Sequence, residues 1–254
     1  MSLNRYLITG ITIILISGIA IFYNAPYNIE NNNTLFQVST LNSLSSGNFD
    51  GNFSISELKK YGNTGIGTFN GLDGEMIELN GVIYQVKSDG NIIRVNDSEM
   101  VPFAMVTDFN PDKTLFINHS MNYMELISYL NVTVPSKDLF YSFKVMDSFD
   151  YVKVRSPKEQ NKPYPNLTEA LKTQNIFNLN NLNGTMVGFW CPALASSLNL
   201  NDYHFHFINE KRDSGGHVLD LKLRNVIIEI DYIPDICLYS SQNNSFYRVN
   251  LINS

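Results

Sequence analysis

Residues 202–233 read DYHFHFINEKRDSGGHVLDLKLRNVIIEIDYI and carry the clearest structural pattern in the chain. The stretch begins with alternating histidine and aromatic residues. This alternation is typical of a strand, because successive strand side chains point to opposite faces. A polar segment at 209–216 follows and ends in two glycines, and a long stretch with recurring apolar residues then reaches residue 233. The order predicts a strand, a loop and a long second strand that can pair with the first.

The rest of the chain alternates between short strands and short helices. Asn80 and Gly81, between MIEL and VIYQV, predict a β-hairpin because both residues tolerate positive φ. Helices are expected at residues 56–62, 121–130 and 168–174, each with a polar residue near its start. The predicted class is therefore α+β, in two packed halves with mixed and antiparallel sheets.

The N-terminal segment differs in composition from the rest. Residues 7–23 read LITGITIILISGIAIFY without a charge, and Arg5 precedes them. Such a run predicts a signal peptide or membrane anchor, and the Asn-rich residues that follow predict a tether. We therefore expect a signal or anchor with its tether at 1–33, an N-terminal half at 34–136 and a largely antiparallel half at 137–254. This organisation predicts an extracytoplasmic protein, secreted or anchored to the membrane.

Composition narrows the function classes. The chain has 254 residues, and its 18 basic and 24 acidic side chains give a net charge of −6. Nucleic-acid binding requires clustered Lys and Arg, so a chain without a basic run is a poor candidate. Hydrophobic residues make up 44%, which is enough for a packed core. Cys191 and Cys237 are too few for a disulfide scaffold or a four-thiolate metal site, and whether they pair stays open.

Three of the four histidines lie close together in the sequence. His204 and His206 are two residues apart, so both project from the same face of a strand. If the two strands pair across the Gly-Gly loop, His217 approaches them. Three neutral imidazoles with an open fourth position are typical of a catalytic zinc site, although other divalent ions also accept imidazole. The competing interpretation is a solvated sheet face that binds nothing.

A cupin-type metal motif is the other metal hypothesis. His204, His206 and Glu210 match its His-x-His-x3-Glu core. However, Leu198 and His217 stand where that motif has glycines, and no second cupin motif follows. The three-histidine interpretation is therefore favoured.

Four blocks of sequence together carry a resemblance to a known family. Residues 65–77 read GIGTFNGLDGEMI, residues 151–157 read YVKVRSP, residues 187–192 read VGFWCP, and GGHVLD at 215–220 follows the first two histidines. In this order they resemble the acetolactate decarboxylases, over roughly residues 35–231. The resemblance implies a two-part α/β protein, often a homodimer. It also implies a Zn²⁺-dependent enzyme that converts the small molecule 2-acetolactate to acetoin and carbon dioxide.

The resemblance also assigns site residues. The zinc ligands would be His204, His206 and His217, and the catalytic residues facing the substrate would be Glu75, Arg155 and Thr68. Alternation supports part of this, because it places Arg155 on a strand face opposite Val152 and Val154, where it can line a site. Members of this family often bring a further Glu from a C-terminal tail, whereas no residue after Asp235 is acidic here.

Two alternative functions stay open at this point. The same three histidines can activate water in a zinc hydrolase, whose substrate would be an ester or amide. A non-catalytic, exported metal-binding module would bind metal weakly and form no acetoin.

Overall fold

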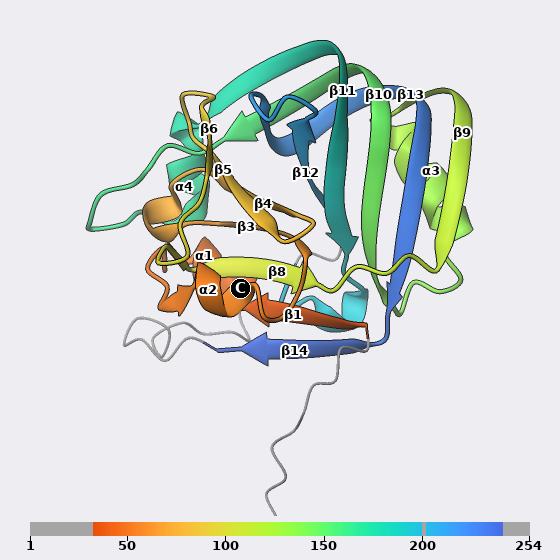
Figure 1. Cartoon of the computed structure of the whole chain (residues 1–254). Coiled ribbons are helices and arrows are strands. Elements are labelled where there is room, and N and C mark those ends of the chain that lie inside the picture. Colours follow the sequence, from red (N-terminus) through yellow and green to blue (C-terminus); the bar gives the residue numbers. More distant parts are fainter. Residues whose placement is uncertain (1–32, 200–201, 241–254) are drawn as a thin grey trace, which may run out of the picture. The chain divides into compact units, whose positions relative to one another are not determined.

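The computed structural model describes residues 33–199 and 202–240 (Figure 1). The expected signal or anchor at residues 7–23 lies outside the described residues. Within the described part of the chain, no helix is long and apolar enough to cross a membrane. Cys191 and Cys237 are both unpaired.

The described elements follow in chain order. They are β1 (Thr34–Val38), α1 (Leu41–Ser45), β2 (Phe53–Ser54), α2 (Ile55–Leu58), β3 (Thr64–Thr68), η1 (Asn70–Leu72), β4 (Glu75–Leu79), β5 (Val82–Val86), β6 (Ile92–Arg94), β7 (Met100–Val101), β8 (Phe103–Thr107), β9 (Lys113–Asn122), α3 (Tyr123–Thr133), β10 (Phe140–Ser156), α4 (Leu167–Ala170), η2 (Leu171–Thr173), β11 (Asn175–Trp190), η3 (Ala193–Ala195), β12 (Tyr203–Asn209), β13 (Gly215–Ile233) and β14 (Asp235–Tyr239).

Most of these strands form two sheets. The first has the order β14-β1-β8-β3-β4-β5-β6, and it is mixed because β1 and β14 run parallel. In the second sheet β10, β11, β12 and β13 pair in a closed circuit, and β9 adds to β13. All of these second-sheet pairs are antiparallel. The expected α+β class with mixed and antiparallel sheets is confirmed.

The two sheets do not follow the expected halves strand by strand. β9 precedes residue 137 but pairs in the second sheet, whereas β14 follows it and pairs in the first. The domain boundaries at 34–136 and 137–254 stay a prediction.

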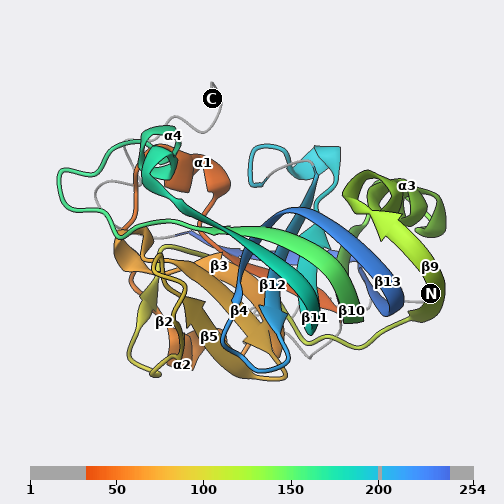
Figure 2. The same cartoon turned by 90° about the horizontal axis from the view of Figure 1, so that it is seen from above.

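Three apolar clusters hold these layers together. The inner face of the second sheet packs on Leu126 and Leu130 of α3, which lies beside β9 (Figure 2). A second cluster lies between the sheets and joins Ile77 of β4 to Ile208 of β12. The third cluster lies on the other face of the first sheet, where side chains of the sheet pack against α2. β4 is therefore buried on both faces, and one of these faces looks toward β12.

Local chemistry sets the ends of the helices. The helix expected at 121–130 begins later, because Met121 still pairs with Leu223 in β9. Asn122 then caps α3 by accepting a hydrogen bond from Glu125, whose carboxylate accepts one from Asn122 in return. The expected hairpin is confirmed: Asn80 has φ +51° and joins β4 to β5.

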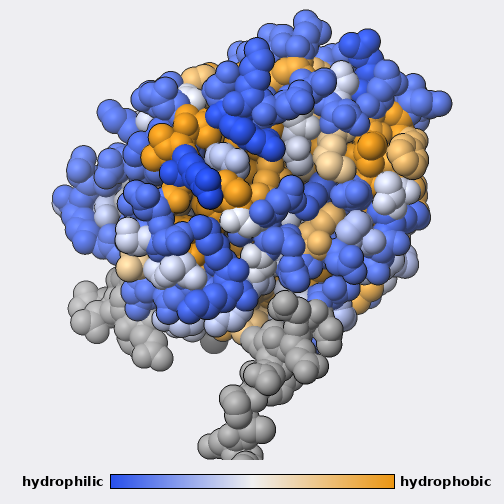
Figure 3. Space-filling view, viewed as in Figure 1, coloured by the Kyte–Doolittle hydropathy of each residue, from blue (hydrophilic) through white to orange (hydrophobic). Residues whose placement is uncertain are grey.

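Apolar side chains also reach the surface. Phe116 of β9 is 77% exposed, and Met124 and Val132 of α3 are 68% and 82% exposed. On the face seen in Figure 3, hydrophobic surface also lies among the hydrophilic residues.

Candidate active site

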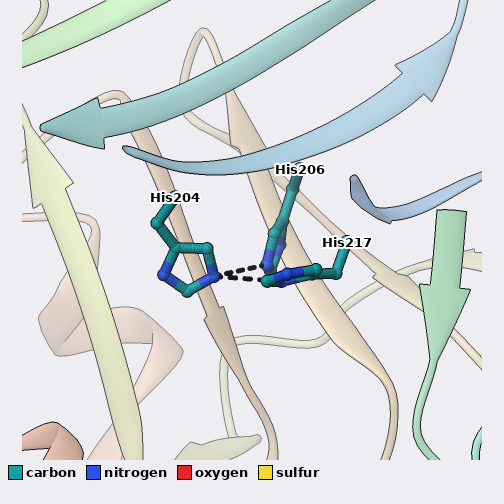
Figure 4. A group of neighbouring side chains, drawn as sticks. All are labelled: His204, His206 and His217. Atoms are coloured by element: carbon teal, nitrogen blue, oxygen red, sulfur yellow. Dashed lines mark hydrogen bonds between the residues drawn. The ribbon is translucent and has the colours of Figure 1, made fainter. Parts of the chain in front are cut away.

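The three clustered histidines meet where β12 and β13 pair. His206 and His217 are partners across these strands, and His204 lies two residues before His206 on the same face. His204 Nε2 lies 3.2 Å from His206 Nε2 and 3.1 Å from His217 Nδ1. Figure 4 shows the three rings pointing toward one another. The expected strand–loop–strand pairing and the convergence of the histidines are therefore both confirmed.

These histidines are neutral in the folded protein. Burial lowers the pKa of His204 to about 3, and nearby Arg155 adds to the shift. Burial likewise places the pKa of His206 and of His217 well below the usual value. His206 donates from Nδ1 to the Met76 carbonyl oxygen at 2.8 Å, so its Nε2 keeps a free lone pair. Neutral imidazoles with free lone pairs are the form that binds metal.

The spacing of the nitrogens fits one metal ion. The three candidate ligand atoms all lie within 4.8 Å of one another. Nitrogens bound to one tetrahedral ion at about 2.05 Å would lie about 3.3 Å apart. The two close separations of 3.1 and 3.2 Å are near this value. His204 Nδ1 is buried without a hydrogen-bond partner in the described part of the chain, so no such acceptor fixes the tautomer of that ring.

A cavity of about 250 Å³ opens beside the histidines. All six residues expected at the site line it: Thr68, Glu75, Arg155, His204, His206 and His217. They come from β3, β4, β10, β12 and β13, so both sheets contribute. Glu210, the third residue of the cupin hypothesis, is exposed and lies outside the group of possible metal ligands.

Glu75 begins β4 and faces this cavity from a buried position. Its Oε2 lies 3.5 Å from His206 Nε2. Burial raises the pKa of Glu75 from 4.5 to about 7, while Arg155 opposes the shift. A carboxyl group with this pKa is partly protonated at neutral pH and can act as an acid.

Thr68 supports Glu75 through the turn between β3 and β4. Thr68 and Glu75 are partners across these strands. The Thr68 hydroxyl donates to the Gly74 carbonyl oxygen at 2.7 Å, and Gly74 has φ +79°. Because the hydroxyl has a single proton, Thr68 can only accept a hydrogen bond from a molecule in the cavity.

Arg155 lies opposite His217 in the pairing of β10 with β13. Its Nη1 donates to Gln174 Oε1 at 3.0 Å. Gln174 directly follows η2, and sequence reasoning placed it only at the end of a helix. No pattern in the sequence relates it to Arg155.

The remaining cavity wall is apolar and was also missed. Leu41 and Leu44 of α1 line one side, and Leu167 of α4 and Leu171 of η2 line another. These helices lie side by side (Figure 2), although more than 120 residues separate them. Such a wall keeps water away from the polar end of the cavity.

The cavity brings together an arginine, a carboxyl group of raised pKa and three histidines that can hold a metal, which is a set of groups typical of enzyme sites. The family model described as alpha-acetolactate decarboxylase matches residues 35–253. The alpha-acetolactate decarboxylase of Methanosarcina mazei is 40% identical over 92% of this chain and 82% of its own length. That of Bacillus subtilis is 42% identical over 86% of each chain.

Solved structures agree with these relatives. The crystal structure of the alpha-acetolactate decarboxylase of Bacillus subtilis strain 168 superimposes with a TM-score of 0.85 at 41% identity, covering 87% of this chain and 94% of that one. The chain belongs to the alpha-acetolactate decarboxylase family and is an enzyme of the carboxy-lyase class. This membership favours a carboxy-lyase over the hydrolase and the non-catalytic module.

Proposed function

We propose that the chain decarboxylates 2-acetolactate to acetoin and carbon dioxide, with Zn²⁺ held by His204, His206 and His217. The observation that carries the proposal is the convergence of three neutral imidazoles with Arg155 and Glu75 on one cavity, in a chain of this family. Zinc is the metal we favour, because three imidazoles with an open position are its usual catalytic ligand set.

The reaction makes two demands on the site. Loss of carbon dioxide from 2-acetolactate leaves an electron pair that is delocalised into the neighbouring keto group, and a proton must then reach carbon. A zinc ion held by the three histidines would act as a Lewis acid for the negative charge on the substrate oxygens. The protein's own groups must bind the carboxylate, orient it and supply the proton.

Arg155 binds the substrate carboxylate in this proposal. A guanidinium group offers paired N–H donors that match two carboxylate oxygens. When Arg155 holds the carboxylate, the carbon–carbon bond that breaks can be oriented out of the plane of the keto group. In this orientation the electron pair of the bond can delocalise into the keto group. The apolar wall from α1 and α4 contacts the methyl groups and excludes water.

Glu75 supplies the proton. Burial raises the pKa of its carboxyl group, which favours the protonated form that can donate. A general acid works best when its pKa lies near the working pH. Thr68 holds the turn before Glu75 and so keeps that carboxyl group in the cavity.

The test is acetoin release from racemic 2-acetolactate by the full chain loaded with Zn²⁺. We expect zinc-dependent release that is lost when His204 and His206 are both changed to Ala. His119 is exposed and lies outside the cluster, so His119→Ala is the matched control and should keep both zinc and activity.

Two outcomes would contradict the proposal. Folded, zinc-loaded protein without acetoin release would keep the metal site but refute the reaction. Full release from the double variant, or stoichiometric zinc in it, would refute the ligand assignment.

We also propose that the enzyme acts outside the cytoplasm as a homodimer. The uncharged residues 7–23 support export or anchoring. The exposed Phe116, Met124 and Val132 support a contact surface between two copies. Cell fractionation tests the first point, and light scattering of the purified chain tests the second.

A further inference from the structure

We infer that Gln174 is a positioning residue, which holds Arg155 with a neutral acceptor and so leaves the guanidinium charge available for the substrate carboxylate. The inference rests on the proposed role of Arg155 as the carboxylate-binding group.

The geometry around Arg155 singles out Gln174. Arg155 Nη1 donates to Gln174 Oε1 at 3.0 Å, and both side chains are half-buried. Among the described residues, no carboxylate oxygen lies within 4.0 Å of the Arg155 guanidinium. An arginine side chain has five N–H donors. Several of them therefore remain for an acid in the cavity that Arg155 lines.

The neutrality of the acceptor matters for an anionic substrate. A carboxylate at position 174 would also orient Arg155, but it would neutralise the charge and repel a second carboxylate. An amide oxygen orients the guanidinium and leaves its full positive charge. This is the chemistry expected at a site that must take up an acid and release neutral products at every turnover.

The backbone keeps Gln174 in place. Its N–H donates to the Leu171 carbonyl oxygen at 3.3 Å, which ends η2. The next residue, Asn175, pairs with Ser156 of β10, and its side chain donates to the Ser88 carbonyl oxygen at 2.7 Å. Because Ser156 follows Arg155 directly, the same strand pairing fixes both ends of the Arg155–Gln174 contact.

The test compares Gln174→Met, which has similar length but no amide acceptor, with Gln174→Glu, which keeps the acceptor and adds a charge. Two ligands are titrated into zinc-loaded protein. One is 2-hydroxy-2-methylpropanoate, which has the carboxylate and hydroxyl of the substrate, and the other is acetoin, which lacks the carboxylate. Lys172→Gln is the control, because Lys172 is exposed and pairs only with Glu169 in the described part of the chain.

We expect Gln174→Met to bind the hydroxy acid about tenfold more weakly, the range for one hydrogen bond to a charged group. Gln174→Glu should bind it more weakly still, although Glu has nearly the shape of Gln. Acetoin affinity and zinc content should match those of the unmodified protein in both variants. In turnover, KM for acetolactate should rise more than kcat falls.

Other outcomes would overturn the inference. If Gln174→Glu binds the acid as tightly as the unmodified protein, Gln174 serves only to fill space. Unchanged acid binding in Gln174→Met removes the positioning role, and equal loss of acid and acetoin indicates a general disruption of the cavity. The binding measurement needs no turnover, so it tests Gln174 even if acetolactate proves not to be the substrate.

Discussion

Glu78 gives the sharpest prediction about stability. It lies on β4 with a fully buried side chain, and neither carboxyl oxygen has a hydrogen-bond partner among the described residues. Burial raises its pKa from 4.5 to about 8, and Lys59 opposes the shift only in part. The carboxyl group is therefore protonated in the folded protein at neutral pH. Replacing it by the neutral amide in Glu78→Gln removes its titration.

The size of the effect follows from the two pKa values. The unfolded chain releases this proton near pH 4.5, whereas the folded protein keeps it until about pH 8. Between these values the folded state binds more protons, so the free energy of unfolding falls as the pH rises. One pH unit corresponds to about 1.4 kcal/mol, so the loss by pH 7.5 is at most about 4 kcal/mol. Below 4.5 and above 8 the contribution of Glu78 no longer changes.

Urea unfolding of the full chain at about pH 5, 6.5 and 8, followed by the fluorescence of the single tryptophan Trp190, measures this slope. Near pH 5 Glu78→Gln should be the less stable protein by about 1 kcal/mol or more, because its amide adds an unpaired donor. Between pH 5 and pH 8 the free energy of unfolding of Glu78→Gln should rise by about 3–4 kcal/mol relative to that of the unmodified protein. Glu99→Gln changes an exposed carboxylate and is the control. Its free energy of unfolding should follow the same pH dependence as that of the unmodified protein. Parallel curves for Glu78→Gln as well would refute the buried, protonated state of Glu78.

The site yields three further predictions. Glu75→Gln should lower turnover about 10²–10⁴-fold in folded, zinc-loaded protein. In the unmodified protein the rate should fall as rising pH removes the acid form of Glu75, whose pKa burial raises, and a pH–rate profile checks both expectations. Thr68→Val should lower the free energy of unfolding by about 1 kcal/mol, because the Gly74 carbonyl oxygen loses the hydroxyl that donates to it at 2.7 Å. Thr68→Ser keeps this donor, so its free energy of unfolding in urea should be close to that of the unmodified protein. Gly188→Ala should lower the free energy of unfolding by about 1–3 kcal/mol and weaken zinc retention, because the new Cβ would lie 2.2 Å from the His204 backbone oxygen. Thermal unfolding and metal analysis measure the two effects, and an unchanged result in both would contradict the prediction.

The histidine cluster could be predicted from sequence because its geometry is local. Two residues in one strand share a face whenever they are two apart, and a short loop brings the next strand back beside the first. His206 and His217 therefore pair as expected. The hairpin at Asn80 and Gly81 was predictable for the same reason, since the turn chemistry lies within the turn.

The contacts that orient the site residues join parts of the chain that are far apart in sequence, so they could not be predicted from the sequence. A register shift between Lys153 and Val154 helps to bring Arg155 opposite His217, and no residue type marks it. The carbonyl oxygen that fixes His206 belongs to Met76, 130 residues earlier. Every residue has a carbonyl oxygen, so composition and spacing cannot identify this partner.

β4 shows why residue type alone does not assign a role. Glu75 and Glu78 are three apart, so they point to opposite faces of one strand. Glu75 meets His206 across the gap between the sheets, whereas Glu78 shares the face of Met76, which packs against α2. Burial raises the pKa of both carboxyl groups, but only one of them faces the cavity.

The two raised pKa values should therefore appear in different measurements. Glu78→Gln should change the pH dependence of unfolding and leave the pH–rate profile as it was. Glu75→Gln should abolish most of the turnover. If Glu78→Gln instead shifted the pH at which the rate falls, the two carboxyl groups would be coupled through β4. The separation of a catalytic face from a structural face on this strand would then be wrong.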